Sequence, residues 1–224
     1  MKKVAMLLVC MMVASGVAMS QGFKVTSVGG ALNFNGLLGP GGATEAQSSG
    51  GVGFGFGPFL GVNAKVRAMG GPQMVRWTGA VGYDIYQAEG STFKATQGVL
   101  AIELGAEYPL KEMKMGAMSL WPYLSGALAL NMFPGATVES KVAGFTVGTI
   151  DSKTRVGLVI GAGAEYVMKE GLSIDAGLKF GIANLIGKGA SGTKDVLYTS
   201  STTSNEEGTW MPLTLRLGIN YTLK

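Results

Sequence analysis

The sequence predicts an all-β protein, an eight-stranded antiparallel up-and-down β-barrel that crosses a membrane. Three observations predict this fold. Apolar and polar residues alternate through most of residues 52–223, the alternating segments run for about 12 residues or more, and an export signal precedes them. Such segments are long for a soluble sheet but suit tilted strands that span a bilayer.

The first 20 residues are predicted to be a signal peptide, which leaves residues 21–224 as one outer-membrane β-barrel domain. A basic start, an apolar stretch and small residues at the cleavage site support this reading. Cys10, the single cysteine of the chain, lies inside the predicted signal peptide. The exported barrel is therefore expected to contain no disulfide bond.

Eight segments carry the period-2 pattern that is typical of strands with two different faces. In the fourth segment, for example, the even positions from Leu100 to Leu110 are apolar, whereas Glu103 and Glu107 occupy odd positions. The predicted strands are 23–35, 52–67, 74–86, 97–110, 119–133, 154–168, 172–186 and 210–223.

The connections between these segments alternate in length. Those after the second, fourth and sixth strands are short, and the others are longer and rich in Gly, Ser and Thr. An outer-membrane barrel has short turns at one end and long loops at the other, so we expect this organisation here. The alternation in Thr137–Ile150 predicts that the third long loop stands above the membrane as a hairpin. Pro58 predicts a bulge or a local break in the second strand.

The charged residues of the second to eighth strands all share one parity, opposite to the apolar one. We therefore expect an uncharged face toward lipid and a charged face toward the lumen, with interfacial aromatic residues at both ends of the barrel. The expected lumen charges are Lys65, Arg67, Arg76, Asp84, Glu103, Glu107, Arg155, Glu165, Asp175, Lys179 and Arg216. The expected girdles are Trp77, Tyr108, Tyr166 and Tyr221 near the short turns, and Phe34, Phe54, Phe56 and Tyr83 near the loops.

The end of the chain carries a polar residue, a glycine, an aromatic residue and a hydrophobic residue as Arg216, Gly218, Tyr221 and Leu223. With this pattern the chain resembles the small outer-membrane β-barrel proteins of OmpA/OmpX type. The resemblance implies that the barrel-assembly machinery recognises these four residues and that outer-membrane lipid surrounds the barrel. Lys224 departs from the family pattern, which usually finishes on an aromatic residue.

The composition argues against several function classes. The chain has no histidine, the base on which the known enzymes among such barrels rely, and no Cys/His metal-binding pattern. Glu165 and Asp175 could form a carboxylate pair, although a salt-bridged barrel interior explains them better. The small net charge of the chain, +4, gives no argument for nucleic-acid binding. We predict a protein without enzymatic activity or cofactor.

A charge network is predicted to fill the lumen. If the third and fourth strands pair, Arg76 lies opposite Glu107, and Glu103 is the expected anion for both Lys179 and Arg216. An unpaired charge in a narrow lumen is unfavourable, so these groups should bond to one another and close the barrel.

The favoured function is a structural or surface-interaction role, such as adhesion or binding of an extracellular ligand through the loops. The polar residues 200–207 of the last long loop do not indicate which ligand would bind. The alternative is a narrow channel or a transporter of small apolar solutes through a lateral gap near Pro58. The sequence leaves the ligand, the conductance and the oligomeric state open.

Overall fold

The computed structural model describes residues 25–49, 51–54, 59–68, 75–90, 93–116, 118–141, 146–168, 171–192, 198–201 and 203–223. Four sequence-based expectations lie outside these residues. They are the signal peptide, the bulge at Pro58, the position of Phe56 in a girdle and the departure at Lys224.

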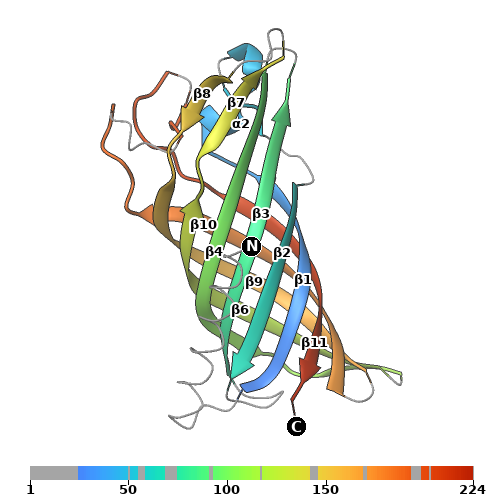
Figure 1. The fold of residues 1–224 in the computed structure, drawn as a ribbon. Helices are drawn as coiled ribbons and strands as arrows, with labels where there is room; N and C mark the ends of the chain where they lie inside the picture. The colour runs from blue at the N-terminus through green and yellow to red at the C-terminus, as the bar shows by residue number, and fades with distance from the viewer. Residues whose placement is uncertain are drawn as a thin grey trace.

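Within the described residues, eight long strands form a closed antiparallel barrel (Figure 1). Each strand pairs with its neighbours along the chain, and the last strand pairs with the first over Ser27–Leu37, which closes the sheet. The predicted fold class is therefore confirmed. The barrel strands are β1 (Val25–Leu37), β2 (Phe59–Ala68), β3 (Arg76–Glu89), β4 (Phe93–Pro109), β6 (Met118–Phe133), β9 (Lys153–Val167), β10 (Leu172–Ile186) and β11 (Pro212–Thr222).

Three shorter strands extend the sheet at its two ends. At the end opposite the C-terminus, β7 (Ala136–Ser140) pairs with the first residues of β4 and with β8 (Thr146–Ile150). These two strands are the hairpin expected within residues 137–150. At the other end, β5 (Met113–Met115) pairs with the start of β6. We call the end with β7 and β8 the loop end, and the end with β5 and the C-terminus the terminal end (Figure 1).

The β1–β2 connection contains two short helical turns, α2 (Gly41–Thr44) and η1 (Gln47–Ser49). No helix in the described part of the chain is long and apolar enough to cross a membrane.

The second strand is shorter than predicted, because it begins at Phe59 rather than at residue 52. Gly53 has a φ of 87°, a left-handed conformation that does not continue a strand. Phe54 is 2% exposed and packs inside the mouth of the barrel, so its predicted place in the outer girdle is wrong. Gly51, Gly53 and Phe54 therefore belong to a folded loop, although their spacing resembles that of a strand.

The outer face of the barrel carries a broad band of exposed aliphatic side chains. A contiguous apolar band around a closed barrel has no stable place in water and fits the hydrocarbon of a bilayer. The band includes Leu32, Leu60, Val62, Leu104, Leu124, Leu128, Leu158, Ile160, Leu178, Leu215, Leu217 and Ile219.

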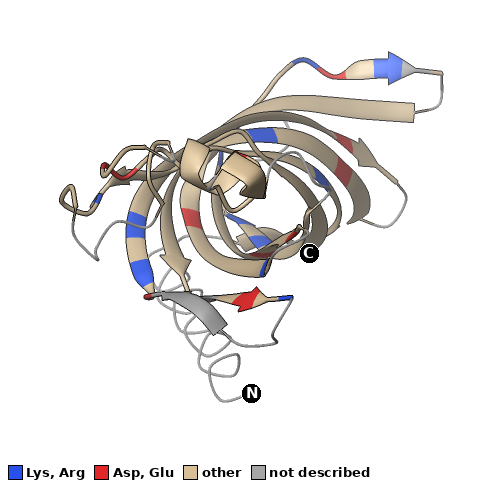
Figure 2. Cartoon of the chain, turned by 90° about the horizontal axis from the view of Figure 1, so that it is seen from above, with Lys and Arg blue, Asp and Glu red and all other residues tan. Residues whose placement is uncertain are grey.

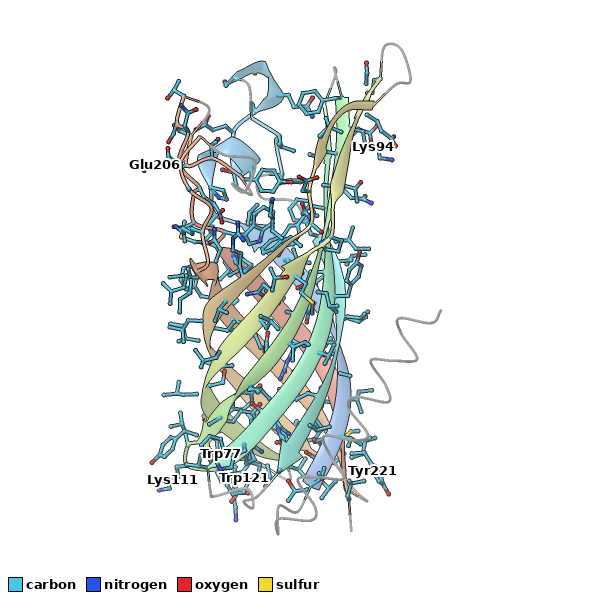
Figure 3. The ribbon with its side chains drawn as sticks, turned by 60° about the vertical axis from the view of Figure 1, so that its left-hand side comes forward. Trp77, Lys94, Lys111, Trp121, Glu206 and Tyr221 are labelled. Atoms are coloured by element: carbon cyan, nitrogen blue, oxygen red, sulfur yellow. The ribbon has the colours of Figure 1, made fainter. Side chains whose placement is uncertain are left out.

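Exposed aromatic residues lie toward both margins of this band. Trp77 and Tyr221 lie at the terminal end (Figure 3), and the exposed Tyr108 lies near the end of β4. On the other side of the band, the exposed Phe34 and Tyr83 lie toward the loop end. Aromatic side chains of this kind mark the boundaries between membrane and water.

Candidate functional site

The inner face of the barrel is polar because β2, β3, β4, β9, β10 and β11 each place buried charged side chains in the lumen. Figure 2 shows the strands as a closed ring around the lumen, with both signs of charge along them. At the terminal end of this lumen, charges from six strands form one cluster, which we call the charged plug. Its members are Lys65, Arg67, Arg76, Glu107, Glu165, Asp175 and Arg216, all buried.

Asp175 is the central acceptor of the charged plug. One of its carboxylate oxygens, Oδ2, accepts hydrogen bonds from Lys65 Nζ at 2.7 Å, from Arg67 at 3.1 Å and from Arg216 at 2.6 Å. The other oxygen accepts a hydrogen bond of 2.6 Å from the hydroxyl of Tyr123. Since Asp175 is only 1% exposed, these donors replace water as its solvation shell.

Glu107 and Glu165 complete the anionic side of the plug. Glu107 lies 2.8 Å from Lys65 Nζ, 2.7 Å from Arg67 Nε and 3.1 Å from an Arg76 nitrogen. Glu165 accepts hydrogen bonds from Arg67 at 2.9 Å and from Arg76 at 2.8 Å. Each carboxylate is thus shared between cations, and a shared network of this kind is rigid because no member can move alone.

The ring of Tyr123 adds a second kind of contact with the cations. Lys65, Arg67 and Arg76 lie 5.7, 5.9 and 5.6 Å from its centre, within the range of cation–π attraction. Gly163 of β9 lies beside this ring in the barrel wall. A Cβ atom at this position would stand 2.5 Å from the Tyr123 ring. The glycine leaves the space that the tyrosine fills.

The predicted network is only partly arranged as expected. Arg76 lies opposite Glu107 in the β3–β4 register, and Lys179 Nζ lies 2.5 Å from Glu103 Oε2. Arg216, however, pairs with Asp175 and not with Glu103. Arg216 is in register with Gly177, midway between Lys179 and Asp175, and its side chain extends toward the terminal end to reach Asp175.

The sequence analysis identified the inward direction of Lys65, Arg67, Glu165 and Asp175 but not their place in the plug. The parity of a residue gives the face on which it lies. The depth of that residue depends on the stagger between strands, which follows from the closed barrel as a whole.

Two small cavities of about 30 and 50 Å³ lie along the lumen, the first next to the charged plug and the second nearer the loop end. Glu103 and Lys179 line both cavities, so their ion pair stands between them. Toward the loop end, the carboxylate of Asp84 accepts hydrogen bonds from the amides of Asn33 at 3.0 Å and Asn35 at 2.8 Å. Each cavity has room for one or a few water molecules.

A cluster of aromatic rings closes the loop end of the lumen, and we call it the aromatic cap. Strand residues and loop residues contribute to it equally, and each ring is packed edge-on or tilted against others. Trp210 is at its centre, with ring centroids 5.2 Å from Tyr86, 5.3 Å from Tyr198 and 5.5 Å from Phe133. The members are Phe54, Phe59, Tyr86, Phe133, Tyr198 and Trp210, all buried.

Polar contacts hold the loops of the cap in place. The amides of Gly41 and Gly42 donate to the carbonyls of Ser200 and Thr199, at 3.0 and 3.1 Å, which joins the β1–β2 and β10–β11 connections. Burial raises the pKa of the Tyr198 phenol, so its hydroxyl stays protonated and donates to Gln97 Oε1 at 3.1 Å. The loops therefore fold into the mouth of the barrel.

A buried ion pair anchors the same loop to the barrel wall. The guanidinium of Arg155 donates to both carboxylate oxygens of Glu207, at 3.0 and 2.8 Å. The Asn184 amide donates to Glu207 Oε1 at 2.8 Å. This bidentate arrangement fixes the direction in which the loop enters β11.

The residues of the predicted assembly signal have diverse surroundings. Arg216 belongs to the charged plug, and Gly218 lies where a Cβ atom would stand 2.6 Å from the Cβ atom of Ala31 on β1. Tyr221 and Leu223 are exposed on the outer surface at the terminal end. Arg216 and Gly218 therefore contribute to packing inside the barrel. Recognition of all four residues by the assembly machinery stays a prediction.

The described residues contain no group of three or more His, Cys, Asp or Glu side chains that could hold a metal ion. Asp175 and Glu165 face each other across β9 and β10, as the sequence suggested. Each carboxylate forms an ion pair with an arginine, the arrangement of a salt-bridged barrel interior.

The closed barrel, its apolar band and its filled lumen define the class: this is a small outer-membrane β-barrel. The chain is similar to a major outer membrane protein from Thermus thermophilus, with a TM-score of 0.54 and 15% identity over 89% of this chain and 100% of that one. That likeness shows the same fold.

Two further solved structures are similar at lower scores. Neisserial surface protein A matches with a TM-score of 0.47 and 18% identity, over 90% of this chain and 97% of that one. Ail, the attachment invasion locus protein of Yersinia pestis, matches with a TM-score of 0.46 and 15% identity, over 90% and 98%. No protein-family model and no curated protein matches the sequence.

Proposed function

We propose that this protein is a non-enzymatic barrel of the outer membrane that is closed at rest and acts as a structural and surface-interaction protein through its loops. The observation that carries the proposal is the double closure of the lumen. The charged plug fills one end, and the aromatic cap fills the other.

The energetics of the plug favour a closed state. A path through the terminal end requires the separation of Asp175 from Lys65 and Arg216, which are all buried and hydrogen-bonded. Leaving one such charge without its partner typically costs about 3–5 kcal/mol. A wide aqueous pore also has no place in an eight-stranded barrel, whose interior is filled by side chains.

The surface role rests on the loop end. In this proposal the loop end faces the outside of the cell and the terminal end faces the periplasm, as in barrels with long loops on one side. Lys94 and Glu206 lie at the loop end (Figure 3), and the ion pair of Lys141 with Glu89 is exposed there. A folded, polar platform of this kind suits an extracellular ligand.

Conductance in planar bilayers tests the proposal. We expect the purified barrel to show no sustained current, whereas the Asp175→Asn, Trp210→Ala double variant, which weakens both closures, opens small and irregular conductances. Sustained conductance of the unmodified protein would favour the narrow-channel alternative. Uptake of a radiolabelled apolar solute into vesicles that contain the unmodified barrel would favour the transporter instead.

Binding tests the surface role separately. Cells that display the barrel should adhere to a ligand-coated or cell-coated surface more than cells that display a variant with residues 188–206 replaced by a short Gly-Ser turn. Equal adhesion across such surfaces would leave only the structural part of the proposal.

A further inference from the structure

The β5–β6 hairpin forms an arm that leaves the barrel wall at the terminal end. Met113 lies opposite Leu120, Lys114 opposite Ser119 and Met115 opposite Met118. The pairing of β6 with β9 begins only at Leu120, so the tip of the arm extends past the neighbouring strand. Figures 1 and 2 both show the arm reaching sideways, away from the ring of strands, rather than along the barrel axis.

The arm has two different faces. Even-numbered residues of β6, such as Leu124 and Leu128, form part of the lipid-facing band, and Met118 continues that parity into the arm. Met113 pairs with Leu120, and therefore lies on the same side. Met113 and Met118 are 51% and 48% exposed, which is a large exposure for side chains this apolar.

The opposite face of the arm is polar. Lys114 is exposed there, and the carboxylate of Glu112 accepts a hydrogen bond from the hydroxyl of Ser119 across the hairpin. Lys111 is exposed at the base of the arm. The arm thus combines an apolar side that continues the lipid-facing band with a polar side that carries Lys114, and Lys111 stands exposed at its base.

The position of the arm matches the boundary of the bilayer. Lys111 lies at the same end of the barrel as the exposed Trp77 and Tyr221 (Figure 3). Exposed aromatic side chains collect at the level of the lipid headgroups. A sideways hairpin at this level therefore runs within the plane of the headgroups.

We propose that this arm is a membrane-interface anchor that binds the phospholipid leaflet at the terminal end of the barrel. The side chains of Met113 and Met118 enter the acyl region just below the headgroups. Lys111 and Lys114 reach the lipid phosphates, since lysine keeps its charged end in water while its stem lies along apolar surface. Continuity with the lipid-facing band selects lipid as the occupant over a protein partner.

The experiment uses the absence of cysteine from residues 21–224. Single variants Met113→Cys, Met118→Cys and Lys114→Cys are labelled with the environment-sensitive dye NBD and reconstituted in vesicles of phosphatidylcholine and phosphatidylglycerol. Lys114 is the matched control, because it neighbours Met113 on the other face. Retention of the folded barrel is checked for each variant by its heat-dependent gel mobility.

Lipids that carry a nitroxide on the acyl chain should quench the dye at positions 113 and 118 several-fold more than the dye at position 114. The emission at 113 and 118 should also shift to shorter wavelength on transfer from detergent to vesicles. Equal quenching at all three positions would overturn the proposal. Weak quenching at positions 113 and 118, together with disulfide-linked dimers of unlabelled Met113→Cys, would also overturn the proposal. In that case the apolar side of the arm packs against a second copy of the chain.

Discussion

Arg216 of β11 donates a hydrogen bond of 2.6 Å to Asp175 of β10, and the same carboxylate oxygen accepts hydrogen bonds from Lys65 and Arg67 of β2. Asp175 thus links its own strand β10 to β11, the strand that closes the barrel, and to β2. Its loss leaves several buried cations facing one another, whereas the loss of Glu103 leaves only Lys179 without its partner.

This difference predicts an order of stabilities. Asp175→Asn should lower the free energy of unfolding by about 3–5 kcal/mol, the usual effect of removing one partner of a buried ion pair. Glu103→Gln should have a smaller effect, because the Glu103–Lys179 pair borders the cavities and is less buried. Urea unfolding in lipid vesicles measures both values. Equal losses for the two variants would contradict a plug centred on Asp175.

The lipid-facing band predicts a strong effect of charge on the outer surface. Leu104 is 68% exposed and lies opposite Leu128 in the β4–β6 register. Leu104→Arg should destabilise the barrel by about 2–4 kcal/mol, as arginine does near the middle of a bilayer. Leu104→Met keeps an apolar side chain at the same place and serves as the control. If both variants unfold in vesicles at the same urea concentration, the band does not face hydrocarbon.

Protease treatment of intact cells tests the proposed orientation. A glutamate-specific protease should cut after Glu206, which is exposed in the β10–β11 connection, and leave Glu112 at the terminal end intact. Mass spectrometry of the fragments identifies the site. Cleavage after Glu112 in intact cells, with Glu206 protected, would reverse the topology.

The packing of the aromatic cap predicts that the side chain of Phe54 protects the β1–β2 connection from proteolysis. Phe54 contacts the rings of Phe59, Tyr86, Tyr198 and Trp210, and its amide donates to the Ala43 carbonyl at 2.9 Å. Truncation in Phe54→Ala removes these contacts, so the β1–β2 connection should open and expose the bond after Glu45 to a glutamate-specific protease.

A matched control exists for this experiment. Phe34 is also a phenylalanine near the loop end, but it is exposed on the outer face. Phe34→Ala should leave the rate of cleavage after Glu45 unchanged. Similar rates for both variants and the unmodified barrel would show that the cap does not hold the loop.

Much of this fold could be predicted because a barrel strand repeats every two residues and its two faces meet different surroundings. The alternation at Glu103 and Leu104 is enough to predict which side chain faces the lumen and which faces lipid. The predicted strand 172–186 matches β10 at both ends. Local patterns carry this information, so a single sequence is enough to read it.

Other features depend on contacts between residues far apart in the chain. The pairing of Arg216 with Asp175 follows from the stagger between β10 and β11, which the alternation of residues does not encode. Phe54 has the parity of a strand residue, yet it packs against Tyr198 and Trp210 of a loop about 150 residues later. Tertiary packing overrides the local pattern in both cases.

The charged plug also bears on how the barrel reaches its correct register. Its residues come from β2, β3, β4, β9, β10 and β11, so no pair of adjacent strands can assemble it alone. A slip of one residue in β2 would turn Lys65 and Arg67 from the lumen into hydrocarbon. Misregistered barrels are therefore penalised at several strands at once. Buried charges that close the lumen of the finished protein thereby also discriminate against wrong strand alignments while it folds.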